Sequence, residues 1–135
     1  MKKIYLLLFI FAFSSFSERA LSEDKFYFDA DFSVFKGPSA KSIVEVYFSF
    51  TQKSLVFMKS GNDFVGVANT QIIIKDVTNS NEVFNEIFGL QSVVKDTASS
   101  KLLNRLIGQQ NLTIPSGSYE ISFVGFDQNK PERKD

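Results

Sequence analysis

Residues 42–51, Ser-Ile-Val-Glu-Val-Tyr-Phe-Ser-Phe-Thr, decide the fold class of this chain. Successive side chains of a β-strand point to opposite faces, so apolar residues at every second position indicate a strand with one buried face. The stretch follows this period of two. The residues that we expect in the core are Val44, Val46, Phe48 and Phe50.

The same period occurs on the N-terminal side of this stretch, from Phe26 to Val34. We expect one face of this segment to be buried and the other to carry Tyr27, Asp29 and Asp31. The residues of the expected buried face are Phe26, Phe28, Ala30, Phe32 and Val34. Gly37-Pro38-Ser39 then separates the two strands, because glycine and proline favour turns.

Further strand signals continue to the end of the chain. The expected strands are 55–58, 64–77, 82–94, 110–114 and 118–127. The run Ile72-Ile73-Ile74 predicts burial on both sides. Pro115-Ser116-Gly117 predicts a hairpin between the last two strands. For residues 95–106 the sequence leaves a loop, a short helix or a lead-in to the next strand open. Within 82–94 the expected core residues are Val83, Phe84, Ile87 and Phe88.

Six or seven short strands separated by turns predict an all-β domain over residues 23–127. A two-sheet antiparallel sandwich of the immunoglobulin or fibronectin type III kind is the architecture that we expect, and a small open barrel is the alternative. Residues 128–135 are polar and lack a core residue, so we expect a polar tail or a truncated linker there.

Residues 1–22 have the pattern of a cleavable signal peptide. Lys2 and Lys3 precede ten apolar residues, Ile4 to Phe13, and Ala20-Leu21-Ser22 forms a small-x-small cleavage pattern. The apolar run is shorter than the roughly 20 residues of a membrane-spanning helix. We therefore expect export to the periplasm or cell surface, with membrane contact only through the transient signal peptide.

The composition excludes several classes of function. The chain has no cysteine and no histidine, which removes disulfides, thiolate chemistry and the usual general base near neutral pH. Without the leader, 12 basic and 14 acidic residues remain, and the basic ones are scattered. Nucleic-acid binding requires clustered basic residues, so we exclude it. We expect no catalytic, cofactor-binding or metal-binding residue.

One acidic pair offers an alternative to this expectation. Asp29 and Asp31 lie on one strand face and could offer carboxylates to a calcium ion or to sugar hydrolysis, if folding adds a third ligand such as Asp127. A solvated strand face is the simpler interpretation.

Four segments together resemble a known family. They are Phe26-Tyr27-Phe28-Asp29, residues 44–50, Ser54-Leu55-Val56-Phe57 and residues 112–119. Their order is similar to the N-terminal region of GWxTD domain-containing proteins. These are exported bacterial proteins in which a signal peptide and a β-sandwich region precede a C-terminal domain named for its Gly-Trp-x-Thr-Asp motif.

The chain departs from this family at the naming motif, since it contains no tryptophan. What the C-terminal domain does cannot be carried over. The resemblance implies either a fragment that ends near Asp135 or a stand-alone relative of the N-terminal module.

Three functions follow as hypotheses. The first is a non-catalytic exported module that contacts a protein partner, or scaffolds an attached domain, by strand addition at a sheet edge. The second is a carbohydrate- or calcium-binding accessory module. The third is a hydrolase, which would need a cleft holding acidic residues of perturbed pKa.

The signal peptide gives the first testable prediction. Intact-mass spectrometry of the exported protein should give a chain that starts at Glu23, within a few residues. Leu7→Arg should block export, because a charge interrupts the apolar segment. Recovery of an exported chain that still begins at Met1 would contradict the prediction.

Overall fold

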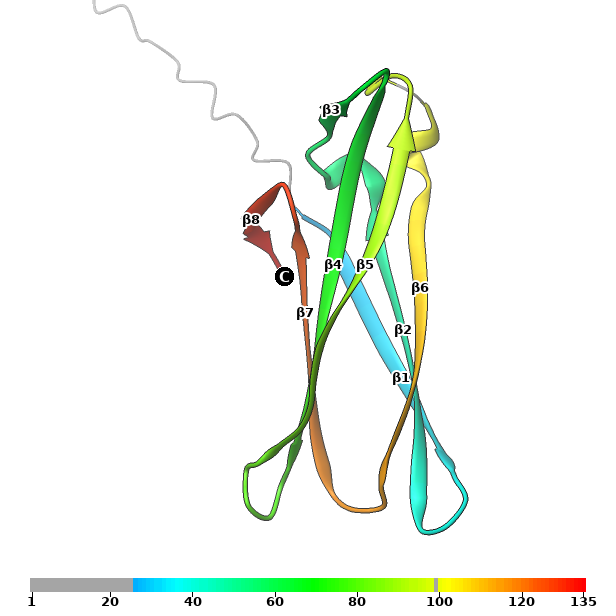
Figure 1. The fold of residues 1–135 in the computed structure, drawn as a ribbon, viewed down its shortest axis with the longest axis vertical. Helices are drawn as coiled ribbons and strands as arrows, with labels where there is room; N and C mark the ends of the chain where they lie inside the picture. Colours follow the sequence, from blue (N-terminus) through cyan, green and yellow to red (C-terminus); the bar gives the residue numbers. More distant parts are fainter. Residues whose placement is uncertain (1–25, 99) are drawn as a thin grey trace, which may run out of the picture.

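The computed structural model describes residues 26–98 and 100–135, which form an all-β protein with two antiparallel sheets (Figure 1). The first sheet, sheet A, contains β1 (Phe28–Lys36), β2 (Lys41–Thr51) and β6 (Arg105–Pro115), in the order β1-β2-β6. The expected all-β fold is confirmed, and its strands lie in two separate sheets, as in a β-sandwich. The predicted signal peptide, residues 1–22, lies outside the described residues.

Sheet B is built around a long central strand, β4 (Asp63–Asp76). On one edge β4 pairs with β5 (Glu82–Val94). On the other edge it pairs with β3 (Met58–Ser60) at residues 63–65 and with β7 (Tyr119–Asp127) at residues 68–76. A short last strand, β8 (Lys130–Lys134), pairs with β7.

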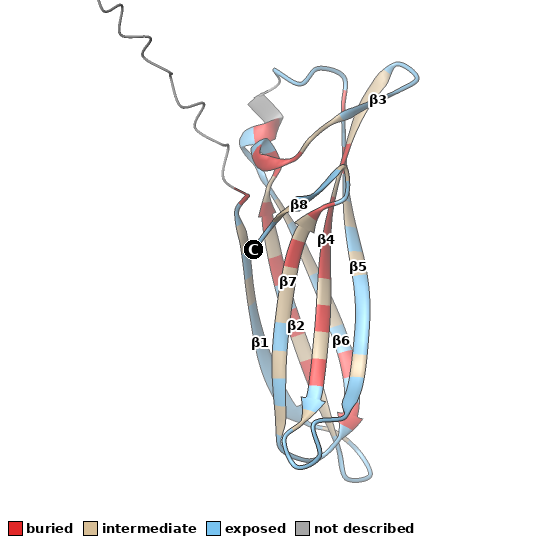
Figure 2. Ribbon diagram, turned by 90° about the vertical axis from the view of Figure 1, so that its left-hand side faces the viewer, coloured by how far each residue is buried: buried red, intermediate tan, exposed pale blue. Residues whose placement is uncertain are grey.

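The core lies between the two sheets and is formed mainly by alternate residues of β2 and β4. The predicted core residues of β2, Val44 to Phe50 at every second position, are all buried. Ile72 and Ile74 of β4 are fully buried, whereas Ile73 is only partly buried, so burial on both sides is not complete. Figure 2 shows this as red segments that alternate along β4.

Phe50 is the centre of an aromatic cluster in this core. Its ring centroid lies 5.0 Å from that of Phe28 and 5.7 Å from that of Phe26. Phe28 in turn packs on Gly125 of β7, where an added Cβ would lie 2.3 Å from Cγ of the phenylalanine. Glycine at this position therefore allows β1 to approach the opposite sheet.

One connection differs from the sequence prediction. The turn at Pro115-Ser116-Gly117 does not form a hairpin, because β6 pairs with β2 and β7 pairs with β4. The chain crosses there from one sheet to the other. A local turn signal predicts that the chain reverses direction, but it does not predict which strand the next strand pairs with.

Residues 95–106, for which the sequence left three structures open, contain turns, a 3-10 segment at Ser100–Leu103 and the start of β6.

The expected strand 55–58 is also displaced. Gln52–Ser54 form a 3-10 turn, residues 55–57 are irregular and the strand β3 begins only at Met58. The turn signal that follows is confirmed, since Gly61 adopts a φ of +61°, which glycine adopts without steric cost.

Four residues that we expected in the core are exposed. On β1, Phe32 is 43% and Val34 is 56% exposed, although their partners on β2, Val46 and Val44, are buried, because β1 is the edge strand of sheet A. On β5, Val83 and Ile87 lie on the outer face, whereas the even-numbered Phe84 and Phe88 pack toward the core. Both faces of β5 carry apolar residues, so their pattern does not identify the inner face.

The C-terminal residues are more ordered than a polar tail or truncated linker. The N–H of Asp135 donates to the C=O of Gly125, and the N–H of Gly125 donates to the C=O of Asp135, both at 2.9 Å. Backbone pairing of this kind requires no apolar side chain, so composition gave no sign of β8. The segment extends sheet B.

Within residues 26–98 and 100–135 there is no helix with the length and apolar character that spanning a membrane requires.

The aromatic cluster gives a prediction for stability. Phe50→Ala should lower the free energy of unfolding by about 3–5 kcal/mol, because it removes a fully buried ring and leaves a cavity. Phe35→Ala is the matched control, since Phe35 is 48% exposed and should lower stability by no more than about 1.5 kcal/mol. Urea denaturation measures both; equal effects would contradict the assignment of the core.

Candidate binding surfaces

The outer face of sheet A carries the acidic pair that the sequence singled out. Asp29 and Asp31 are exposed on β1, and Asp29 forms an ion pair with Arg105 of β6. The same guanidinium donates a hydrogen bond to Ser49 Oγ at 2.7 Å. Arg105 lies within residues 95–106, for which several structures were left open, so this pairing could not be predicted. An ion pair this exposed contributes little to stability.

A shallow depression of about 290 Å³ lies at this place on sheet A. Its exposed rim includes Tyr47, which is 39% exposed, and Ile107. The Tyr47 hydroxyl donates to Glu45 Oε2 at 2.5 Å, and this hydrogen bond raises the pKa of the phenol above its ordinary value, with small contributions from burial and from the negative charge of Glu45. The lining residues are Asp29, Ala30, Asp31, Tyr47, Phe48, Ser49, Arg105 and Ile107.

Asp127, the proposed third ligand, does not join the acidic pair. It is fully buried at the end of β7, and its two carboxylate oxygens accept the N–H of Val56 at 2.6 Å and the N–H of Asn129 at 2.8 Å. Asn129 Nδ2 also donates to the C=O of Val56 at 2.8 Å. The carboxylate therefore holds an irregular loop against sheet B. Within the described ranges, no group of three or more acidic side chains is placed to hold a metal ion.

The backbone N–H and C=O groups of the odd-numbered residues of β5 point to an edge of the sheet that is not paired with another strand. In an antiparallel sheet the N–H and C=O of one residue point to the same side, and this side alternates along the strand. The N–H of Val77 donates to the C=O of Ser118, so odd-numbered residues of β4 face β7 and even-numbered ones face β5. Even residues of β4 are paired with even residues of β5, as Thr70 is with Phe88.

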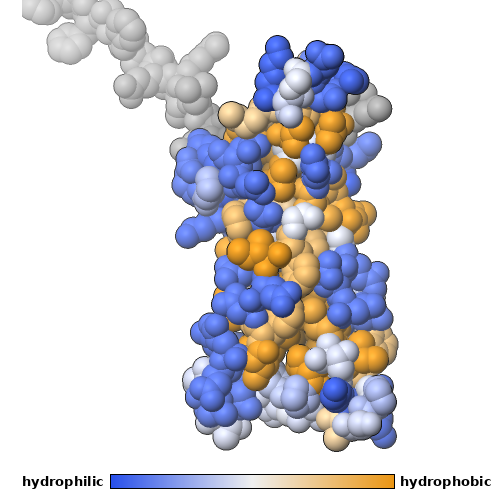
Figure 3. All heavy atoms as spheres, in the orientation of Figure 1, coloured by the Kyte–Doolittle hydropathy of each residue, from blue (hydrophilic) through white to orange (hydrophobic). Residues whose placement is uncertain are grey.

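The odd-numbered residues of β5 from Asn85 to Val93 thus offer their backbone groups to a partner. Among residues 26–98 and 100–135, no strand pairs with this edge. Ile87 and Val93 on the outer face are 57% and 55% exposed. Figure 3 shows apolar side chains along the face on which β4 and β5 lie in Figure 1. An exposed apolar strand edge is a template for binding another strand.

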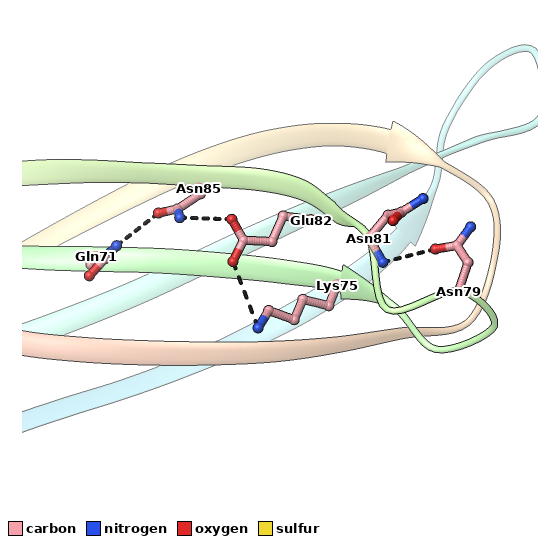
Figure 4. A network of polar contacts seen from close by, with 6 residues as sticks. All are labelled: Gln71, Lys75, Asn79, Asn81, Glu82 and Asn85. Atoms are coloured by element: carbon pink, nitrogen blue, oxygen red, sulfur yellow. Dashed lines mark hydrogen bonds and ion pairs between the residues drawn. The ribbon is translucent and has the colours of Figure 1, made fainter.

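A polar network organises one end of this surface (Figure 4). Gln71 Nε2 donates to Asn85 Oδ1 at 2.8 Å, and Asn85 Nδ2 donates to Glu82 Oε2 at 3.0 Å. Lys75 Nζ lies 3.7 Å from Glu82 Oε1. These side chains come from β4 and β5 and link the two strands near their hairpin.

Comparison with known proteins did not identify a relative. No family model, curated protein or solved structure matches this chain. The resemblance to GWxTD domain-containing proteins therefore stays a prediction.

Asp127 gives a prediction that separates a structural role from a ligand role. Asp127→Ala should lower the free energy of unfolding by about 1–3 kcal/mol for each buried N–H that loses its acceptor. Asp31→Ala, at an exposed carboxylate, should change stability by no more than about 0.5 kcal/mol.

Urea denaturation of both variants, with and without added calcium, provides the measurement. Stabilisation of the natural chain by calcium that is lost in Asp127→Ala would contradict the structural role of Asp127.

Proposed function

We propose that this chain is a non-catalytic exported β-sandwich module that contacts a protein partner or scaffolds an attached C-terminal domain. The open edge of β5 carries the proposal, because it combines unpaired backbone positions with exposed apolar side chains on one long strand. Strand addition at such an edge supplies affinity through main-chain hydrogen bonds and specificity through alternate side chains.

The other parts of the proposal rest on the sequence. The leader supports export to the periplasm or cell surface, and the lack of histidine and cysteine supports a module without catalysis. We further propose a sandwich of the immunoglobulin or fibronectin type III kind and a relation to the N-terminal region of GWxTD domain-containing proteins. The two facing antiparallel sheets are compatible with both.

A second candidate function is carbohydrate binding at the outer face of sheet A. The depression beside Tyr47 favours it, because a partly exposed aromatic ring can stack on a sugar while nearby polar groups hydrogen-bond its hydroxyls. The stacking surface is a single ring with its hydroxyl already bonded to Glu45. We therefore place this function second.

Site-specific photo-crosslinking tests the first function. A photoreactive amino acid replaces Ile87 on β5 or, as the matched control, Ile107 on β6, in the full chain expressed by the organism that carries the gene. Both isoleucines are exposed on the outer face of an edge strand, but in different sheets. We expect a crosslinked adduct of defined mass from position 87 and none from position 107.

Mass spectrometry identifies the crosslinked species as another protein or as a second copy of this chain, and either result supports protein contact. No adduct from position 87, or equal adducts from both positions, would contradict the role of the β5 edge. An adduct from position 107 alone would move the contact to sheet A.

A further inference from the structure

The side of the sandwich at which β1 and β7 meet leaves part of the core uncovered. Phe32 and Val34 belong to the inward-facing set of β1, yet they are 43% and 56% exposed. β7 lies across from them, since the ring centroids of Phe32 and Phe123 are 6.2 Å apart. Figure 2 shows β1 beside β7 along this side. We call the surface formed by Phe32, Val34, Ile121 and Phe123 the open seam.

The strands on the opposite side of the sandwich do not expose their core in this way. The large apolar residues that β5 and β6 expose lie on the outer faces of the two sheets; they are Val83, Ile87, Val93 and Ile107. The inward apolar residues of β5 and β6 are buried or only partly buried. Single apolar residues on an outer face are common, whereas adjoining inward side chains left in water mark an interaction site.

The backbone of β7 beside the open seam is not paired with another strand. Odd-numbered residues of β4 face β7, so even-numbered residues of β7 bond to β4 and odd-numbered ones point away from it. At Gly125 these outward groups pair with Asp135, and β8 pairs with residues 125–127 only. Among the described residues no strand pairs with the outward groups of Tyr119, Ile121 and Phe123.

Two existing contacts indicate which edge of the seam accepts a strand, and in which direction. β8 lies antiparallel on β7, where the backbone groups of Gly125 and Asp135 bond to each other at 2.9 Å. On β1 the even-numbered residues point outward, but the N–H of Phe32 already donates to Asp31 Oδ1 at 2.8 Å. A strand that enters the seam therefore continues the line of β8 and pairs with β7.

We infer that an extended segment of a partner protein occupies the open seam, pairs antiparallel with residues 119–124 of β7 and places apolar side chains over Phe32 and Val34. This inference goes beyond the proposed function, because it adds a second site that is separate from the edge of β5. In this register the partner residues opposite Phe123 and Ile121 point inward, since directly opposite residues share a face. These two positions are apolar, and the positions between them face water.

The outer face beside the seam adds a preference for positive charge. Glu120 of β7 is exposed, and Lys75, its cross-strand neighbour on β4, lies 3.7 Å from a carboxylate oxygen of Glu82. Among the described residues no lysine or arginine forms an ion pair with Glu120. Opposite charges on directly opposite residues of two strands attract. The partner segment is therefore apolar at alternate positions and basic at the outward position opposite Glu120.

A second folded copy of this chain does not meet these requirements. The occupant directs its inward side chains at β1, so that face of the strand cannot already be packed. The edge strands β1, β5 and β6 each direct their inward residues to their own core. A segment that is extended and outside any sheet has both faces available, and addition of such a segment to a sheet edge is a common mode of peptide recognition.

Peptide binding measured by fluorescence anisotropy tests the inference, using the mature chain recovered after export and two labelled peptides titrated to millimolar concentration. The first, Thr-Val-Thr-Val-Lys-Val, places valine opposite Phe123 and Ile121 and lysine opposite Glu120. The second, Val-Thr-Val-Thr-Val-Lys, is the matched control, because it has the same composition with the two faces exchanged. We expect the first peptide to bind at least about tenfold more tightly.

Two lysine variants of β1 distinguish the seam from the rest of the surface. Val34→Lys places a charge on the inward face and should weaken binding of the first peptide by at least about tenfold. Phe35→Lys is the matched control, since Phe35 is the next residue, is 48% exposed and faces outward. It should bind the peptide like the natural chain. Circular dichroism confirms that both variants are folded.

A charge reversal tests the register. Glu120→Lys should weaken binding of the first peptide by about two- to fivefold and strengthen binding of a version with glutamate in place of its lysine by a similar factor. Unchanged binding of both peptides would overturn the register.

The inference is overturned if the first peptide binds no more tightly than the second, or binds Val34→Lys as it binds the natural chain. Sedimentation velocity identifies the alternative occupant, because a dimer that Val34→Lys abolishes, without peptide binding, would assign the seam to a second copy. The crosslink from position 87 reports on the edge of β5 independently. Failure at the seam therefore leaves the proposed function standing, and failure of that crosslink leaves the seam standing.

Discussion

The structure depends on the packing of two central strands, β2 and β4, against each other across one narrow core. Each strand sends alternate side chains into that core, and those of Val46, Phe50 and Ile72 are completely removed from water. The chain has no disulfide to supplement this contact. Burial of apolar surface therefore supplies most of the favourable free energy, and strands that flank the centre are stabilised by pairing with it.

Sequence periodicity identified the strands best where one face is fully buried. The alternation in β2 predicted the inward residues because the outward positions of this strand carry polar residues such as Glu45 and Ser49. The same reasoning failed on β5, where Ile87 and Phe88 are adjacent and both apolar. It also failed at Phe32, since alternation does not show whether a strand lies at the edge or the centre of its sheet.

Long-range pairing could not be derived from the sequence. The turn before β7 was evident, but a turn does not specify which sheet receives the next strand. Asp127 and Asn129 form hydrogen bonds with the backbone of Val56, in a loop that is far away in the sequence. Neither Asp127 nor Asn129 belongs to a recognisable motif. The ion pair between Asp29 and Arg105 likewise depends on the β1-β2-β6 order of sheet A.

The outer faces of the two sheets both mix polar and apolar side chains. Sheet A presents Asp29 and Arg105 beside the exposed Ile107, and sheet B presents Asn85 beside Ile87 and Val93. Residue type alone therefore does not distinguish the two faces.

The close fit of Phe28 on Gly125 affects how the protein reaches its native state. These residues come from the first and the last long strands of the described chain, so their contact closes a very large loop. Contacts between distant segments form late and slow the folding of β proteins. The N-terminal strand cannot complete its packing until β7 has been synthesised, so the native core cannot be completed on a shorter nascent chain.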